Sequence, residues 1–293
     1  MKKQPFTKQA LKQFFYWINE RHAIYIRRHV EKKPWPWTKD PILQQNRFCS
    51  VFRELDKTTI WIRENWREPY ADHKNLWFAM AMARQINKIE TLAEIGFPKR
   101  WQPERVQNII RARMARGEKA YTGAYMITGS LGGDKPSQTA YKILDPLYRK
   151  SPHFIRDPHS LLEEAFIDLV QYRGFGRFLA YEVVTDLRHT RYLCNAPDIM
   201  TWANAGPGAH RGLRRLQGFK VRGEGAKSRY PEQEALDLMR WLLEVSPKYI
   251  HDHVPPLEMR DVEHVTCEID KYLRAKNGEG RLERYRYHSE PLL

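Results

Sequence analysis

The sequence has few cysteines and no long apolar segment. Its three cysteines, Cys49, Cys194 and Cys267, are too few among 293 residues for a disulfide framework, so we expect a reducing compartment. No run approaches the roughly 20 apolar residues that a membrane helix requires. The opening Met-Lys-Lys-Gln-Pro-Phe is not followed by the apolar stretch of a signal peptide. We therefore expect a cytoplasmic protein that has no membrane partner.

Runs that alternate apolar and polar residues, as half-buried strands do, are also scarce. Spacings of three and four residues dominate instead, as in Leu11, Phe14, Phe15 and Ile18. A further helix is predicted from Phe48, Val51, Phe52 and Leu55, which recur at the same steps. Helices are predicted over residues 7–32, 75–94, 103–117, 137–150 and 161–172. The sequence therefore predicts an all-α fold.

Positive charge is abundant. The chain has 50 lysines and arginines against 35 aspartates and glutamates, which gives a formal net charge of +15. Such an excess favours a polyanionic partner, nucleic acid first and an anionic membrane or ribosome surface second. A basic protein without such a partner is the alternative, because net charge alone does not define a binding site.

Residues 169–183 predict a helix, a tight turn and a second helix. The sequence there is Leu-Val-Gln-Tyr-Arg-Gly-Phe-Gly-Arg-Phe-Leu-Ala-Tyr-Glu-Val. Two glycines allow positive φ angles and a close approach of the backbone to another chain. The first N–H groups of the second helix, together with its dipole, favour an anion such as a DNA phosphate. A plain helix corner capped by glycine is the alternative. The predicted DNA-binding residues are Arg173, Gly174, Phe175, Gly176 and Arg177.

An acidic residue follows this hairpin, in Asn195-Ala-Pro-Asp198, where we expect a new helix to begin. Aspartate is a favoured N-cap residue, and an N-cap role is compatible with a catalytic one. The order of hairpin, helix, loop and aspartate resembles the helix-hairpin-helix DNA glycosylase superfamily. The resemblance implies that Asp198 is the catalytic residue. Phe178 occupies the position of the Schiff-base lysine of the lyase type, so we do not expect a lyase mechanism.

The same resemblance implies a glycosylase-like architecture of two helical lobes with a cleft between them. We expect residues 1–293 to form a single helical unit. The hairpin is placed at 160–190, and an N-terminal lobe at 1–150 packs with a C-terminal segment at 231–277.

Four segments together narrow the resemblance to one family. They are Arg47–Thr59, the hairpin Tyr172–Arg177, Trp202–Gly212 and Asp261–Arg274. Combined, they resemble the α-glutamyl/putrescinyl thymine pyrophosphorylases, the amino acid:DNA transferases of phage thymine hypermodification. That family is related to the helical domain of 5-hydroxymethyluracil DNA kinases. The resemblance covers residues 36–284, which is most of the chain.

This closer resemblance implies a reaction on double-stranded DNA that contains modified thymine. The enzyme flips a pyrophosphorylated 5-hydroxymethyluracil, and an amino acid or putrescine replaces pyrophosphate at the exocyclic methylene. Cations placed where charge develops would stabilise the departing pyrophosphate. Alternatively, the cations in question form buried salt bridges with Glu263, Glu268 and Asp270. The candidates are Arg47, Arg53, Arg211, Lys271 and Arg274.

The sequence gives only indirect evidence for a partner protein and for cofactors. No Gly-x-x-x-x-Gly-Lys-Ser/Thr motif is present, and the loop Thr128–Ser137 lacks its spacing, so we assign the kinase step to a partner protein. We expect no structural metal site, because His251, His253, His264 and Cys267 fit no zinc spacing. The sequence fixes no cofactor. Two cofactors are compatible with it: Mg²⁺ that binds together with pyrophosphate, and a monovalent cation that binds at the hairpin.

Two alternative functions share these features. One is a helix-hairpin-helix DNA glycosylase that excises a modified base. The other is a non-catalytic DNA-binding partner of a hydroxymethyluracil DNA kinase. The sequence does not identify the amine donor.

Overall fold

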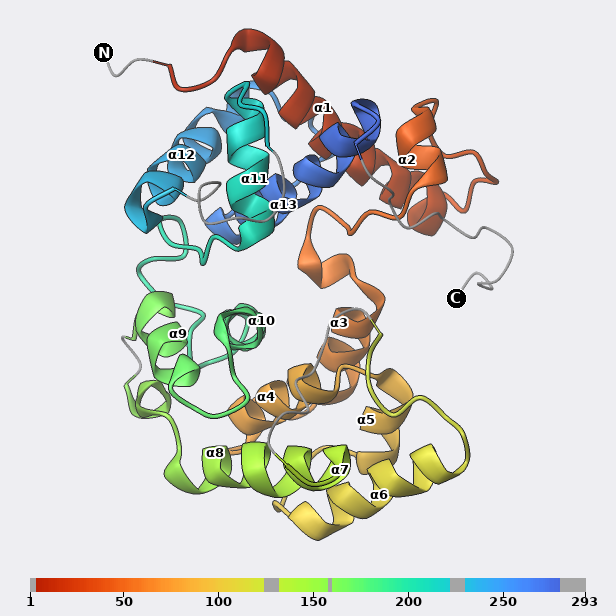
Figure 1. Ribbon diagram of the computed structural model, residues 1–293, viewed down its shortest axis with the longest axis vertical. Coiled ribbons are helices and arrows are strands. Elements are labelled where there is room, and N and C mark those ends of the chain that lie inside the picture. The colour runs from red at the N-terminus through yellow and green to blue at the C-terminus, as the bar shows by residue number, and fades with distance from the viewer. Residues whose placement is uncertain (1–3, 124–131, 158–159, 222–229, 280–293) are drawn as a thin grey trace. The chain divides into compact units, whose positions relative to one another are not determined.

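The computed structural model describes residues 4–123, 132–157, 160–221 and 230–279, and every regular element in these ranges is helical (Figure 1). The predicted all-α class is confirmed. None of the helices in these ranges is both long and apolar enough to cross a bilayer. Part of the predicted loop Thr128–Ser137 lies outside the described residues.

The chain forms two compact units, which we describe separately. Unit 1 combines Met1–Asp56 with Met200–Leu293, and unit 2 is Lys57–Ile199. This division differs from the predicted lobes, because residues 57–150 pack with the hairpin whereas the first 56 residues pack with the C-terminal helices. The predicted cleft concerns the relative placement of the lobes and stays a prediction.

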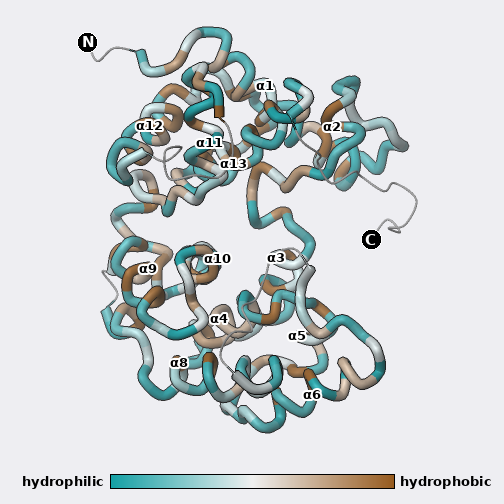
Figure 2. Tube along the Cα trace, in the orientation of Figure 1, coloured by the Kyte–Doolittle hydropathy of each residue, from teal (hydrophilic) through white to brown (hydrophobic). Residues whose placement is uncertain are grey.

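Unit 1 is built around the C-terminal helix α13, which contacts α1, α2, α11 and α12. Apolar and polar residues are interleaved along these helices, so each helix can bury one side (Figure 2). Short π-helical and 3₁₀ turns, Ile26–Val30, Arg53–Leu55 and Ser246–Lys248, extend the helices or link them. The helices of unit 1 are α1 (Lys8–Tyr25), α2 (Pro41–Gln45), α11 (Pro207–Leu216), α12 (Glu232–Val245) and α13 (Met259–Lys276).

Asp40 ties three of these helices together. Its carboxylate accepts the backbone N–H groups of Ile42 and Leu43 and so caps α2. The hydroxyl of Tyr16 on α1 donates to the same carboxylate at 3.1 Å, and that of Tyr272 on α13 donates at 2.8 Å. One aspartate thus sets the start of α2 and its position against α1 and α13.

Two glycines allow α11 and α13 to pack in close contact. A Cβ at Gly208 would overlap the Sγ of Cys267, and a Cβ at Gly212 would overlap the carbonyl oxygen of Thr266. Since these glycines are four residues apart, they lie on one face of α11. The contact therefore requires a residue without a side chain at both positions.

Unit 2 is a set of shorter helices around the apolar helix α4. Three further turns complete it: the π-helical turns Arg63–Arg67 and Gln138–Leu144 and the 3₁₀ turn His153–Arg156, called η5. The helices of unit 2 are α3 (Lys57–Ile62), α4 (Leu76–Ile86), α5 (Ile89–Ile95), α6 (Pro103–Ala115), α7 (Lys135–Ser137), α8 (Asp145–Lys150), α9 (Leu162–Val170) and α10 (Arg177–Leu187).

Two predicted helices are wrong in detail. The helix expected over 75–94 is broken, because Asn87 adopts a left-handed conformation with φ 47° and ends α4, and α5 then begins at Ile89. The helix expected from Phe48 to Leu55 is absent apart from the turn Arg53–Leu55. Phe48 and Val51 lie in a non-helical segment, and both side chains are buried. Their spacing is therefore a consequence of burial and not of a helical period.

We predict that Gly212→Ala lowers the free energy of unfolding by about 2–3 kcal/mol, because the new methyl group must push α11 away from a backbone carbonyl. Urea denaturation followed by circular dichroism measures this loss. Gly123→Ala is the control, since its Cβ would meet no atom within 4 Å and a change below about 1 kcal/mol is expected. An unchanged Gly212→Ala protein would contradict the packing of α11 on α13.

Candidate nucleic-acid interface

The predicted hairpin consists of α9, the turn Gln171–Gly176 and α10. In the turn the N–H of Phe175 donates to the carbonyl of Tyr172 at 3.0 Å. Phe175 is fully buried, so its ring anchors the turn to unit 2. Helix α10 begins at Arg177 with Gly176 as its N-cap, and no side chain caps it. The predicted succession of a helix, a tight turn and a second helix is therefore present.

The two glycines of the turn have different roles. Gly174 has φ 86°, and a Cβ there would come within 2.8 Å of the side chain of Ile143. Gly174 is therefore required by the fold itself. At Gly176 a Cβ would meet no atom within 4 Å, so this end of the turn faces open space. Gly176 leaves the first turn of α10 accessible to a partner.

Basic and apolar side chains surround this accessible end. Arg173 and Arg177 are exposed, and Phe178 is 53% exposed. The guanidinium of Arg177 lies 5.1 Å from the ring centroid of Phe166 on α9, which holds it beside the start of α10. The structure thus presents two cations and a helix N-terminus together, the combination that an anion requires.

Asp198 lies in a turn and not at the start of the expected helix. The next helix, α11, begins only at Pro207. The carboxylate of Asp198 instead accepts the N–H groups of Leu162 at 2.8 Å and of Glu163 at 3.0 Å, which are the first two residues of α9. Asp198 is 8% exposed. It therefore caps the first helix of the hairpin from a distance in sequence, which the local pattern could not reveal.

Three of the five predicted pyrophosphate-binding cations form ion pairs on α13. Asp270, which is 1% exposed, accepts the Nε of Arg211 at 2.9 Å and lies 3.9 Å from the Nε of Arg274. Lys271 donates to Glu268 at 2.5 Å. Burial lowers the pKa of Lys271, but the charge and hydrogen bond of Glu268 together with Cys49 and Cys267 leave the pKa raised. The alternative of a buried salt-bridge network accounts for these contacts.

The other two cations do not share a helical face. Arg47 is exposed on the segment after α2, and Arg53 is half-buried in the turn before unit 2 begins. Arg53 lies close enough to His264 on α13 that its charge contributes to lowering the pKa of that imidazole, after burial and Arg260. All five cations belong to unit 1, whereas Asp198 and the hairpin belong to unit 2. Their role toward pyrophosphate stays a prediction.

Mg²⁺ bound with pyrophosphate, for which Asp56 or Glu268 would be the ligand in this sequence, stays a prediction. Glu268 accepts Lys271 and the backbone N–H of Cys49 at 3.1 Å, so both of its oxygens already have donors. In the described parts of the chain, no three or more His, Cys, Asp or Glu side chains gather as a metal site would need.

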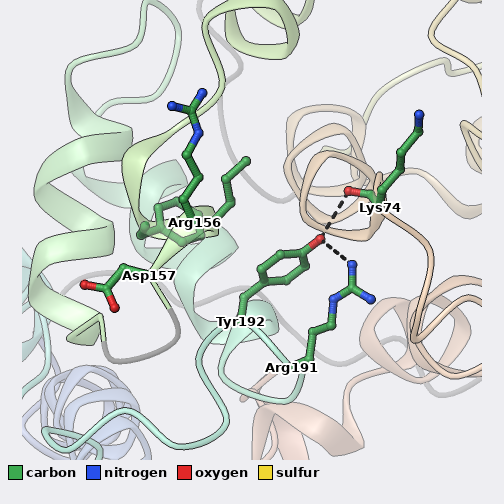
Figure 3. A pocket seen from close by; sticks show the side chains of 7 residues that line it. Lys74, Arg156, Asp157, Arg191 and Tyr192 are labelled. Atoms are coloured by element: carbon green, nitrogen blue, oxygen red, sulfur yellow. Dashed lines mark hydrogen bonds between the residues drawn. The ribbon is translucent and has the colours of Figure 1, made fainter.

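Unit 2 also contains a cavity of about 380 Å³ beside the hairpin helices (Figure 3). The hydroxyl of Tyr192 donates to the carbonyl of Lys74 at 3.1 Å, and Arg191 donates to that hydroxyl at 3.1 Å and to the carbonyl of Asp72 at 2.7 Å. Sequence reasoning missed this cavity, because its residues come from three separate segments without a common motif. The lining residues are Lys74, Phe154, Ile155, Arg156, Asp157, Arg191 and Tyr192.

A buried ion pair of unit 2 was also missed. Arg84 on α4 donates through Nε and a terminal nitrogen to both carboxylate oxygens of Asp186 on α10. The two side chains are 2% and 1% exposed. An arginine in Leu76–Ile86, where Gln85 is the one other polar residue, was the signal available in the sequence.

Together, the fold and the turn define an all-helical, basic protein with a candidate DNA-binding hairpin. A family model described as "5-hmdU DNA kinase, helical domain" matches residues 8–281. The chain belongs to this family. It is 29% identical over 239 residues to a protein of Bacillus phage SP10 named 5-hmdU DNA kinase. This alignment covers 73% of the present chain but only 37% of the phage protein. No solved structure matches.

We predict that Asp198→Ala lowers the free energy of unfolding by about 1–2 kcal/mol, because two N–H groups of α9 lose their acceptor. Chemical denaturation measures the change. Asp252→Ala removes an exposed carboxylate from a turn of unit 1 and should cost less than about 0.5 kcal/mol. Equal stability of the two variants would contradict the conclusion that Asp198 stabilises α9 by capping it.

Proposed function

We propose that this chain acts in the hypermodification of thymine in phage DNA. Its substrate in this proposal is duplex DNA that contains 5-hydroxymethyluracil or its pyrophosphorylated derivative, in the cytoplasm of the infected cell. The supporting observation is the family match over residues 8–281, together with a relative that is named for a kinase of 5-hmdU DNA. Because the sequence has no Gly-x-x-x-x-Gly-Lys-Ser/Thr motif, we assign the phosphorylation itself to a kinase partner.

The contact with DNA is assigned to the turn between α9 and α10. Gly176 leaves the start of α10 open, and Arg173 and Arg177 stand exposed beside it. A backbone phosphate at this point would gain the helix dipole and two cations. The net charge of +15 strengthens the attraction to DNA over the whole molecule.

The proposed reaction replaces pyrophosphate by an amine. The amine nitrogen forms a bond to the exocyclic methylene carbon of the base, the C–O bond to pyrophosphate breaks, and the amine releases one proton. The leaving oxygen takes the electron pair, and the glycosidic bond is unchanged. In this proposal Asp198 accepts the proton or stabilises the cationic base.

A second candidate is a DNA-binding module without its own chemistry. The observation that favours it is the position of Asp198, which is 8% exposed and holds the start of α9. The two N–H groups that this carboxylate accepts are those of a structural helix cap. In this case the chain would present modified DNA to a partner enzyme, and the hairpin would still carry the binding.

We predict that the double variant Arg173→Glu/Arg177→Glu binds duplex DNA at least about tenfold more weakly. The slope of log affinity against log salt should also fall by about two. Glutamate suits the first turn of a helix, so α10 should stay folded. Fluorescence anisotropy with a labelled duplex at several salt concentrations measures both effects. Arg100→Glu, which reverses an exposed charge elsewhere in unit 2, is the control. Equal losses in the hairpin and control variants would show that the hairpin has no special role.

The reaction is tested with DNA that carries pyrophosphorylated 5-hydroxymethyluracil and a panel of amines, followed by nucleoside mass analysis. We expect one amine to appear on the exocyclic carbon with release of pyrophosphate. Asp198→Asn should bind the same DNA and lose transfer, since it can no longer accept a proton. Full transfer by Asp198→Asn would exclude Asp198 from the chemistry. A free base among the products would indicate a glycosylase instead.

A further inference from the structure

The cavity of unit 2 combines an apolar wall with a basic rim. Phe154, Ile155 and Tyr192 contribute the wall, and Tyr192 is 9% exposed. Lys74, Arg156 and Arg191 contribute three cations from three different segments, and all three are exposed. A volume of about 380 Å³ lies within the range of small-ligand pockets, roughly 300–1,000 Å³. This combination suits a ligand that has a planar, weakly polar part and negative charge beside it.

The cations of this rim differ from two arginines of unit 2 that form ion pairs. Buried Arg84 pairs with Asp186, and Arg113 pairs with Glu94 and Glu118. Lys74 and Arg156 form no ion pair within the described residues. Arg191 donates to the carbonyl of Asp72 and to the hydroxyl of Tyr192, and neither of these neutral acceptors compensates its charge. Asp157 adds one carboxylate to the lining, so three cations face one anion and the rim keeps a net positive charge that a ligand can compensate.

The cavity lies close to the turn that we assign to DNA. Its η5 segment packs on α9, where the carboxylate of Asp168 accepts the backbone N–H groups of His153 and Phe154. The pKa of Tyr172, in the turn itself, is raised by burial and by Asp168, and the charge of Arg156 partly opposes this rise. The cavity wall formed by η5 and the turn that follows α9 are therefore neighbours within unit 2.

We propose that this cavity receives one extruded nucleotide of the DNA strand that the hairpin holds. The base lies against Tyr192, Phe154 and Ile155, and the flanking phosphates lie on Lys74, Arg156 and Arg191. Free pyrophosphate would use the basic rim but not the apolar wall, so we favour a nucleotide. The inference rests on the proposed function, because it requires that the chain binds DNA. Asp198 does not line this cavity, so we assign the cavity to holding the extruded nucleotide and not to the amine transfer.

The test uses a duplex in which a single 5-hydroxymethyluracil is paired with 2-aminopurine. Extrusion of the pyrimidine leaves the 2-aminopurine unpaired, and its fluorescence rises. We expect this rise with the unmodified protein and its loss in Lys74→Ala/Arg156→Ala. The affinity of this variant for the duplex should fall about tenfold, and the slope of log affinity against log salt concentration should fall by about two. Thermal unfolding of each variant verifies that unit 2 stays folded. Arg100→Ala, an exposed arginine of unit 2 outside the cavity, should behave as the unmodified protein.

Two results would overturn the proposal. In the first, the cavity variant binds the duplex and raises the fluorescence as the unmodified protein does. In the second, inorganic pyrophosphate binds the unmodified protein but not the variant in calorimetry, while the duplex behaves identically with both, which would assign the site to free pyrophosphate. The hairpin variant distinguishes these failures from failure of the proposed function, because it loses DNA binding whenever the hairpin is the DNA contact.

Discussion

The arrangement of unit 2 depends on the pairing of Arg84 with Asp186. The guanidinium of Arg84 also donates to Thr59 on α3 at 3.0 Å and to Asn87 at 3.2 Å. It therefore connects α10, α3 and the end of α4. Removing one partner of a buried pair typically costs about 3–5 kcal/mol, because the remaining charge stays buried and uncompensated. This pair holds α10 against α4 and thereby fixes the direction in which the hairpin presents its glycines.

The rest of the candidate interface builds on that fixed helix. Asp198 holds the beginning of α9, Gly174 fits the turn over Ile143, and buried Phe175 anchors it. These contacts belong to the protein interior, whereas Gly176, Arg173 and Arg177 face solvent. The same short segment is thus rigid on one side and basic on the other. A rigid backbone with exposed cations is well suited to a phosphate strand, because little ordering is left to the binding step.

The sequence predicted the features that depend on local patterns. Helical spacing predicted α1, α6 and α9, and the Gly-x-Gly segment predicted the turn before α10. It could not predict long-range relations. The break at Asn87 required one residue to adopt a left-handed conformation, and the cap made by Asp198 joins positions about 36 residues apart. The charges on α13 were recognised as either ligands or salt-bridge partners, and only the three-dimensional contacts showed their ion pairs. The cavity draws its residues from three segments, so no local pattern could assemble it.

Hydrogen–deuterium exchange of the protein with and without a duplex containing 5-hydroxymethyluracil tests the central claim most directly. If unit 2 grips DNA at the hairpin, exchange should slow in residues 171–179, and in 153–157 and 190–192 around the cavity. Slower exchange confined to unit 1, with the hairpin unchanged, would contradict the account.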